Sequence, residues 1–359
     1  MNTEKTNNRL HASSLQKNIF IFSLLPVSIL MFRLSAFFPD VVEYVYSRGM
    51  FPVIVQIQYF FTGSVGFSVG EFIVYAFVLF LLVRSVFAFS SLFAKRINKK
   101  TFAFKACKGV FLYAGIVYFL FIFLWGFNYN RKPLAELLLD STEQKDADIS
   151  TQELSVYAEN IIVRINSLSS QVPRDENEIF KLSDTQRNGI KYQAKPFMLS
   201  ALMSKTGISG VYIPFTGEAN YNRNMPNLSI PFSVAHESAH RLGFARENEA
   251  NLIAYLTCLR SDSPEVKYSA ELYVLSYMLS AIHKNDKLLF EKLSGLLNEA
   301  VKKDIRHRNE FWKSQRGAIY NISGSINNIF LKANMQHDGI ESYGRFIELL
   351  ILMHRQELL

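Results

Sequence analysis

The residues best suited to do chemistry form the segment His236-Glu237-Ser238-Ala239-His240. On a helix, His236 and His240 are about one turn apart, so both imidazoles leave the same face and can bind one metal ion. Glu237 is offset by one position, where its carboxylate can take a proton from water instead of binding the metal. A Zn²⁺ ion lowers the pKa of water to about 7, so this pattern is typical of metal-dependent hydrolysis of a carbonyl group. The alternative is a solvated helix face that carries a His/Glu pair.

A catalytic zinc site needs a third protein ligand and an open position. Gly243 is placed to end the helix that carries the histidines, and Glu247 or Glu249 can supply the third ligand from the start of the next helix. We favour Glu247, because Asn251 then follows four residues later on the same face and can hydrogen-bond a ligand histidine. Alternatively, the two glutamates only complement the positive end of the helix, which contributes under about 1 kcal/mol each.

Two further segments could line a substrate cleft. Residues 207–214 predict a strand that leads through Glu218 and Asn220 towards the metal helix, and a peptide can add to such an edge as another strand. Tyr343 and Arg345 could stabilise an oxyanion through hydrogen bonds. Structural roles stay open for all four side chains: a turn for the first two, and core or helix-cap positions for the other two.

The elements that must position these residues begin with a membrane part. Of the 359 residues, 49% are hydrophobic and only 19% are charged, whereas soluble proteins have roughly 25% charged residues. Apolar runs predict three transmembrane helices at about 18–38, 70–92 and 108–127, because about 20 apolar residues cross the hydrocarbon core. Residues 50–61 are apolar but short, and their placement stays open.

Positive charge flanks these apolar runs. Residues 1–17 carry a net charge of +2 and residues 91–108 carry +6, which together equal the +8 of the whole chain. The positive-inside rule therefore predicts a multi-pass membrane protein with a cytoplasmic N-terminus and an extracytoplasmic C-terminal domain. The first run could also be a cleaved signal peptide, but its length and the missing cleavage pattern favour a helix that is retained. Since the rest of the chain nets zero, we expect no nucleic-acid partner.

The composition becomes globular after residue 127, which predicts a membrane domain over 1–127 and a soluble domain over 128–359. The fold class expected is mainly α (α+β), with a small sheet. Ser150 and Glu153 form a capping-box pattern at the start of one helix, which Pro173 ends. Further amphipathic helices are expected at about 231–243, 247–261, 265–284, 286–303 and 339–356.

The pattern Glu247-x-x-x-Asn251 resembles the third-ligand helix of the gluzincin metallopeptidases. The third histidine of a metzincin would fall at Arg246, so that class is rejected. Over nearly its whole length, the chain is also similar to an uncharacterised bacterial membrane family, domain of unknown function 3810. The matching stretches are Trp125–Arg131, Gly210–Asn220, His236–Asn251 and Glu341–Arg345. The resemblance implies a protein of the bacterial cytoplasmic membrane, with membrane helices followed by a zincin-like domain, and it implies no known substrate.

These features predict a membrane-anchored zinc peptidase that hydrolyses peptide bonds on the outer side of the membrane. His236, His240 and Glu247 would bind one Zn²⁺, Glu237 would be the general base, and Asn251 would support a ligand. The expected partners are the lipid bilayer and a peptide or protein substrate. The alternative is a catalytically inactive module for binding or assembly. Intramembrane proteolysis is disfavoured, because the motif lies about 100 residues beyond the last apolar run.

Overall fold

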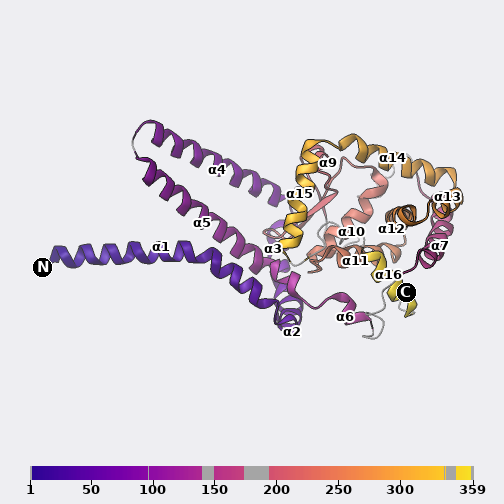
Figure 1. The fold of residues 1–359 in the computed structure, drawn as a ribbon, viewed down its shortest axis with the longest axis horizontal. Helices are drawn as coiled ribbons and strands as arrows, with labels where there is room; N and C mark the ends of the chain where they lie inside the picture. Colours follow the sequence, from indigo (N-terminus) through magenta and orange to yellow (C-terminus); the bar gives the residue numbers. More distant parts are fainter. Residues whose placement is uncertain are drawn as a thin grey trace. The chain divides into compact units, whose positions relative to one another are not determined.

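A computed structural model of the chain describes residues 2–95, 97–139, 149–173, 194–334, 336 and 345–356 (Figure 1). The chain divides into two compact units. The first contains residues 1–54 and 69–131, and the second contains residues 55–68 and 132–359. The short segment 55–68 therefore belongs to the globular unit, although in the sequence it lies between two long apolar helices.

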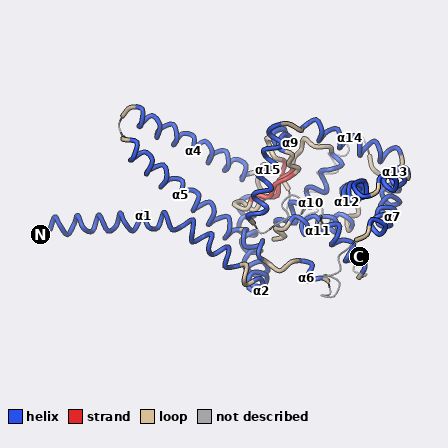
Figure 2. Tube along the Cα trace, viewed as in Figure 1, coloured by secondary structure: helices blue, strands red, loops and turns tan. Residues whose placement is uncertain are grey.

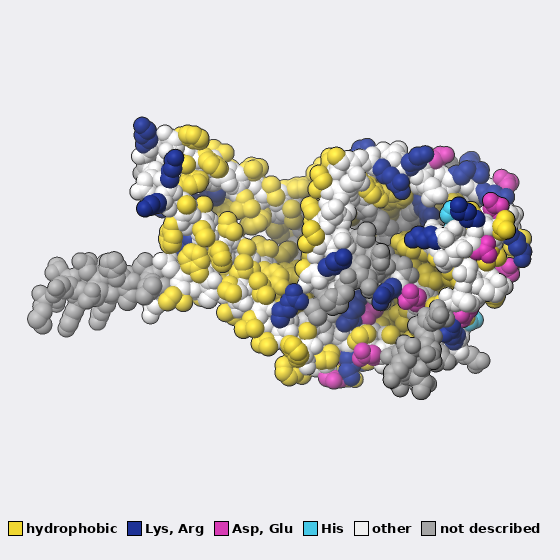
Figure 3. Space-filling model, in the orientation of Figure 1, with side chains coloured by type: hydrophobic (Ala, Val, Ile, Leu, Met, Phe, Trp, Pro, Cys, Tyr) yellow, Lys and Arg dark blue, Asp and Glu magenta, His cyan; other side chains and the backbone are white. Residues whose placement is uncertain are grey.

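Three helices of the first unit are long and apolar enough to cross a membrane. They are Gln16–Ser35 within α1 (Asn2–Ser35), α4 (Val69–Phe93) and α5 (Lys99–Leu124). Hydrophobic side chains cover much of the visible surface of α4 and α5 (Figure 3). The three predicted apolar helices are confirmed. The third ends at Leu124 rather than near residue 127, because Trp125 leaves the helical conformation and the 3₁₀ segment η2 (Gly126–Asn130) follows.

Residues that follow α5 stabilise the first unit through hydrogen bonds. The remaining elements of this unit are α2 (Pro39–Val41), the π-helix η1 (Val42–Met50) and the start of α3 (Phe51–Thr62). The Arg131 guanidinium donates to both carboxylate oxygens of the buried Glu43, at 2.8 and 2.9 Å. Burial raises the pKa of Glu43, but the hydrogen bonds from Arg131 and Arg48 outweigh this and lower it. Asn130 Nδ2 donates to the Phe32 carbonyl at 2.8 Å, which fixes the end of α1.

A three-stranded sheet lies in the second unit and is drawn in red in Figure 2. Its strands β1 (Lys195–Pro196), β2 (Gly210–Ile213) and β3 (Glu218–Tyr221) follow the order β1-β3-β2. β1 is parallel to the central β3, and β2 is antiparallel to β3, with Tyr212 opposite Ala219. The strand predicted over 207–214 is thus confirmed at 210–213. Among the described residues, β2 has a neighbouring strand on one side only.

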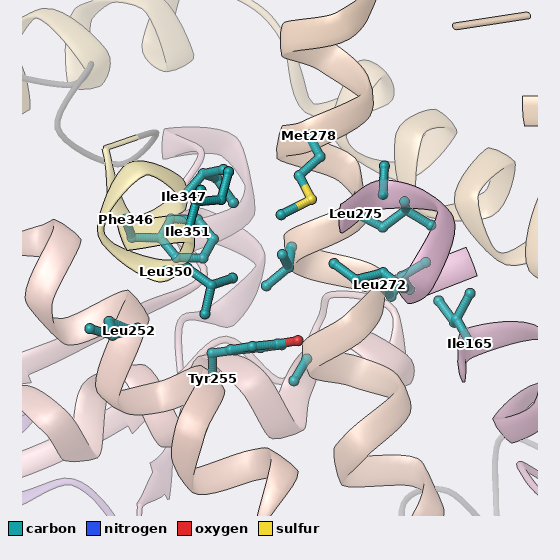
Figure 4. Packing of buried hydrophobic residues seen from close by; sticks show 14 of the residues in the cluster. Ile165, Leu252, Tyr255, Leu272, Leu275, Met278, Phe346, Ile347, Leu350 and Ile351 are labelled. Atoms are coloured by element: carbon teal, nitrogen blue, oxygen red, sulfur yellow. The ribbon is translucent and has the colours of Figure 1, made fainter. Parts of the chain in front are cut away.

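Helices build the rest of the second unit. They are α6 (Leu134–Leu138), α7 (Thr151–Ser169), α9 (Ser200–Thr206), η4 (Asn227–Ser229), α10 (Ile230–Arg241), α11 (Glu247–Leu259), α12 (Pro264–Asn285), α13 (Lys287–Gly295), α14 (Glu299–Gln315), α15 (Ala318–Ala333) and α16 (Phe346–Arg355). The hydrophobic core joins α7, α11, α12 and α16, where Tyr255, Leu272 and Phe346 are among the buried side chains (Figure 4). Burying such side chains is the main force that holds these helices together.

The helix boundaries confirm some predictions and correct others. The N-cap half of the capping box is confirmed, because the Ser150 hydroxyl accepts from the Glu153 backbone N–H at 3.1 Å, whereas the Glu153 carboxylate accepts from Arg355. The helix predicted over 286–303 is wrong as one element: α13 ends at Gly295, and Asn298 caps the separate helix α14 by accepting from the Val301 N–H at 2.9 Å. α15 was not expected. The helix predicted at 339–356 is present as α16 from Phe346 to Arg355, and residues 339–344 of the prediction lie outside the described residues.

Candidate metal centre

The two histidines of the motif lie on α10, whose ends are well defined. Pro231 occupies the first turn, where its missing N–H has no intrahelical acceptor to lose. At the other end, Gly243 adopts a φ of +89°, and the Phe244 N–H donates to the Ala239 carbonyl at 3.2 Å. This is a Schellman-type ending, in which glycine takes the left-handed conformation at little cost. The turn reverses the chain and allows α11 to pack against α10.

The reversal brings three metal-binding side chains together. His236 Nε2 lies 3.1 Å from His240 Nε2. Glu247 Oε2 lies 3.2 Å from His236 Nε2 and 3.6 Å from His240 Nε2. All three side chains are at most 12% exposed. The His/His/Glu group inferred from the spacing is therefore one compact cluster, which could hold a metal ion.

Two backbone contacts orient these ligands. His240 Nδ1 lies 2.7 Å from the Phe244 carbonyl oxygen, so the protonated Nδ1 donates to it and Nε2 is the nitrogen that faces the cluster. The first backbone N–H of α11, that of Glu247, donates to Gln336 Oε1 at 3.1 Å. The turn that ends α10 and a residue after α15 thus fix one ligand each.

The cluster fits a divalent cation by distance and by donor chemistry. Bond lengths of about 2.0–2.2 Å place the ligands of tetrahedral zinc about 3.3–3.5 Å apart. The observed separations of 3.1, 3.2 and 3.6 Å lie close to that range. Glu247 Oε2 is buried and, among the described residues, has no assigned hydrogen-bond donor, although a buried carboxylate oxygen normally has one. A cation bound by all three side chains would satisfy it.

The electrostatics of the cluster also favour positive charge. Burial lowers the pKa of His240, but the Glu247 carboxylate outweighs this effect and raises the pKa to about 9. Burial raises the pKa of Glu247, whereas the two imidazoles lower it well below its usual value. The carboxylate is therefore ionised in the folded protein, and the cluster holds positive charge beside it.

Glu237 faces the sheet beside the cluster. Its carboxylate accepts a hydrogen bond from the Tyr212 backbone N–H of β2. The Asn222 N–H donates to Ser209 O, and the register places residue 211 opposite 220 and residue 213 opposite 218, so residues 209, 211 and 213 direct their backbone hydrogen bonds towards the β3 side. The N–H groups of residues 210 and 212 therefore point away from β3, along the free edge of β2. Glu237 thus lies between the metal cluster and the strand edge where an extended peptide could bind.

Gly210 gives Glu237 the room for this position. A Cβ atom at residue 210 would lie 2.6 Å from both Cγ and Oε1 of Glu237. Burial raises the pKa of Glu237 above its ordinary value, against the opposing effect of the two histidines. A carboxylate with a raised pKa is a stronger base, which suits proton transfer near neutral pH.

The two candidates for the third metal ligand on α11, Glu247 and Glu249, occupy different places. Glu249 Oε1 accepts from the Leu134 backbone N–H at 2.8 Å and from Arg246 Nη1 at 2.9 Å. Glu249 therefore holds the start of α6, and the structure gathers Glu247 into the cluster. Asn251 is fully buried, and its Oδ1 accepts from the Tyr273 hydroxyl at 3.3 Å.

The remaining candidates lie apart from the cluster or outside the described residues. Buried Glu218 pairs with Lys195 Nζ at 2.6 Å, and Lys195 also donates to the Thr62 carbonyl at 2.7 Å. Asn220 Nδ2 donates to the carbonyls of Glu218 and Val211, so it braces the hairpin. Arg345 is exposed at the start of α16. Tyr343 lies outside the described residues.

Several residues at this site were not predicted from the sequence. Gly210, Phe244 and Gln336 act through a missing side chain, a backbone carbonyl and a distant hydrogen bond, none of which leaves a pattern in sequence. Tyr273 had a usable signal, because its hydroxyl lies on a largely buried helix and must find a polar partner.

The comparisons with known proteins agree with this architecture without adding an activity. No curated protein and no solved structure matches the chain. One family model, described as a protein of unknown function, matches residues 46–351, a range that includes the apolar helices α4 and α5 and the metal cluster. The chain therefore belongs to the DUF3810 family.

Proposed function

We propose that this protein is a membrane-anchored, zinc-dependent peptidase that acts on the outer side of the cytoplasmic membrane. The observation that carries the proposal is the arrangement of Glu237 between the His236/His240/Glu247 cluster and the free edge of β2. A structural metal site would need no buried carboxylate beside the ligands and no strand edge next to it.

Each part of the site has a role in peptide hydrolysis. When bound, a zinc ion would acidify water and polarise the substrate carbonyl. The edge of β2 at Gly210 would align an extended peptide through backbone hydrogen bonds. Glu237 would take a proton from the attacking water and pass it to the leaving amine, and the Tyr212 N–H would hold the carboxylate in place.

The membrane assignment rests on the three apolar helices and on the charges that flank them. The basic residues near the N-terminus and between α4 and α5 would face the cytoplasm. With three crossings, the second unit would then lie outside, where the proposed substrates are extracytoplasmic proteins or peptides.

The proposal can be tested with the full-length protein in detergent, loaded with zinc and mixed with a peptide library. Mass spectrometry should detect new peptide ends with the wild type. Glu237→Gln should reduce cleavage by at least about 100-fold, because general-base catalysis contributes about 10²–10⁴ in rate, and it should retain the metal. Glu159→Gln, at an exposed carboxylate of α7, is the matched control. Equal cleavage by wild type and Glu237→Gln would exclude the proposed mechanism.

The second candidate is a binding or assembly module of the same fold. The family match is equally compatible with this candidate and with an enzyme, because it names no activity. A zinc-loaded wild type that cleaves nothing, together with a Glu237→Gln variant that supports the cellular function fully, would favour this candidate.

A further inference from the structure

A small cavity of about 250 Å³ adjoins the part of α10 that precedes His236. Its walls include Phe232 and Ser233 of α10, which precede His236 by four and three residues and so share its face of the helix. Ser209, next to the Gly210 that contacts Glu237, lines another wall. The cavity therefore begins one helical turn from the metal ligands.

The α12 side of this cavity is aromatic and connects to the metal cluster. The Tyr273 ring stacks on Phe232, with centroids 3.8 Å apart, and its hydroxyl donates to Asn251. Tyr277 lies 5.0 Å from Tyr273, ring to ring, and its hydroxyl is close enough to Glu247 for the carboxylate to affect its pKa. A group bound here would be near the reacting atoms of a peptide held at the metal.

Arg308 of α14 supplies a cation to this cavity. Its Nη1 donates to the Leu272 carbonyl at 3.3 Å, and within the described part of the chain it forms no ion pair with a carboxylate. Asp304, one turn earlier on α14, accepts instead from the Tyr268 hydroxyl at 2.6 Å. Burial lowers the pKa of Arg308, yet a guanidinium remains protonated at any physiological pH. A largely buried cation of this kind calls for an anionic partner.

The cationic character continues away from the metal. A second cavity of about 490 Å³ shares four lining residues with the first, namely Met225, Ser229, Leu272 and Arg308. It adds the basic side chains of Arg223 and Lys303, with Asp304 as the acidic residue in its lining. The two cavities therefore adjoin at these residues, and their combined lining carries a positive balance of charge.

We propose that the cavity at Arg308 is a substrate subsite for a carboxylate, which the planar guanidinium can bind through two parallel hydrogen bonds. The inference rests on the proposed peptidase function and specifies its substrate: a peptide with an anionic group close to the cleaved bond. That group is either an acidic side chain or the C-terminal carboxylate of a short peptide. The aromatic walls would contact the aliphatic part of the same residue.

Three dipeptide hydroxamates distinguish these possibilities, because a hydroxamate binds zinc directly. One carries an acidic side chain and an amidated C-terminus, one an uncharged side chain and a free C-terminus, and one is neutral at both places. Binding to the zinc-loaded full-length protein is measured by calorimetry. We expect one of the two anionic probes to bind at least about tenfold more tightly than the neutral probe, and the stronger one identifies the source of the carboxylate.

Variants of Arg308 test whether this preference depends on that residue. Arg308→Gln should abolish the preference while binding of the neutral probe persists, and Arg308→Lys should retain part of it. Arg306→Gln, at an exposed arginine of the same helix, should behave as the wild type. Equal binding of all three probes, or an unchanged preference in Arg308→Gln, would overturn the subsite alone. A zinc-loaded protein that binds none of them would overturn the peptidase proposal as well.

An independent observation concerns α15, whose outer face is apolar. Ile319, Ile322, Ile326 and Ile329 recur every three or four residues and are 54–68% exposed. Residues 311–334 contain no acidic side chain, whereas Lys313, Arg316 and Lys332 flank the stripe. This combination of an exposed apolar face and basic flanks is typical of a helix that lies in the plane of a membrane surface.

We infer that α15 rests on an anionic membrane surface. The segment 55–68 of the same unit supports this, because it runs directly into α4 and exposes Phe60 and Phe61 by 79% and 70%. The positive flanks of α15 match anionic headgroups, and its isoleucines match the acyl boundary. A substrate reaching the metal cluster would then be close to the membrane surface.

Fluorophores attached in proteoliposomes test this placement. Ile326→Cys, on the apolar stripe, should be quenched by brominated lipid chains and shielded from iodide in the water. Asn321→Cys, on the exposed polar side of α15, is the control and should show the reverse, both in a Cys107→Ser background. Accessibility of residue 326 to iodide would contradict the inference, and so would shielding from both quenchers, which would indicate a protein partner instead.

Discussion

At the scale of single residues, the site depends on a few contacts that leave little freedom. Glu237 can lie against β2 only because residue 210 has no side chain. His240 presents Nε2 to the cluster because its other nitrogen is held by the Phe244 carbonyl at 2.7 Å. The spacing of His236, Glu237 and His240 predicted which side chains gather. Their orientation depends on contacts with backbone groups, which cannot be predicted from residue types.

Gly210→Ala tests the position of the general base. The added methyl group would lie 2.6 Å from Glu237 and 2.9 Å from the Asn220 carbonyl oxygen, so the carboxylate and β2 must move apart while the three ligands remain. We expect a loss of peptidase activity of about 100-fold, the effect of a displacement near 1 Å, with unchanged zinc content. Gly295→Ala, where nothing lies within 4 Å of the new methyl group, is the control and should retain activity. Full activity of Gly210→Ala would show that Glu237 has no such constraint.

At the scale of elements, the helices could be predicted where a pattern is local and not where it depends on tertiary contacts. The N-cap at Ser150 and the glycine after α10 could be predicted because each acts within a few residues. The break between α13 and α14 was missed, although Asn298 is a good helix cap, because the apolar pattern continues across it. β3 is buried along its whole length and reads poorly as a strand, since its polar side chains bond within the sheet.

Gly243→Ala tests the turn that joins the two metal-binding helices. At a φ of +89°, a residue with a Cβ is strained, so we expect a loss of about 1–2 kcal/mol in unfolding free energy. Because the same turn positions the Phe244 carbonyl, zinc affinity should also fall. Gly243→Asn, which tolerates the left-handed conformation better, should lose less of both. Equal stability and zinc affinity in wild type and Gly243→Ala would contradict this role.

The pairing of α7 with α16 predicts a pH dependence. The Arg355 guanidinium donates to both oxygens of Glu153, at 2.8 and 2.7 Å, and this hydrogen bonding lowers the pKa of Glu153. A lowered pKa in the folded state means that the ion pair stabilises the fold above the unfolded pKa and loses this effect as the pH falls through the folded value. Glu153→Gln should therefore cost about 0.5–1 kcal/mol at pH 7 and progressively less in acid.

Thermal unfolding at pH 7 and at acidic pH measures this difference. Glu159→Gln on the same helix is the control, since that carboxylate is exposed and lies 4.0 Å from its nearest cation, Lys292. A Glu153→Gln penalty that stays constant down to low pH would show that shape or capping, and not the ion pair, is responsible.

At the scale of the whole molecule, composition and charge are enough to indicate two parts. The apolar helices are where the hydropathy placed them, because a membrane span needs only length and low polarity. The assignment of residues 55–68 to the globular unit could not be predicted. It rests on contacts such as that of Gln58 Nε2 with the Pro214 carbonyl at 2.7 Å, which join residues 156 positions apart.

The proposed topology predicts which loops a membrane-impermeant thiol reagent can reach in intact cells. Asp262→Cys, at an exposed position between α11 and α12, should be labelled without permeabilisation. Ala94→Cys, at an exposed position between α4 and α5, should be labelled only after permeabilisation. Both variants carry Cys107→Ser, and Cys258 is buried. Labelling of residue 94 alone in intact cells would reverse the topology and contradict an extracytoplasmic peptidase.

The central claim is that His236, His240 and Glu247 form one metal site, and metal content tests it most directly. We expect about one zinc per chain in the purified full-length protein after equilibration with the metal, retention of that zinc in Glu237→Gln, and its loss in Glu247→Ala. Unfolding curves confirm that each variant is folded. A folded wild type that binds no zinc, or a Glu247→Ala variant that binds it equally well, would contradict the account.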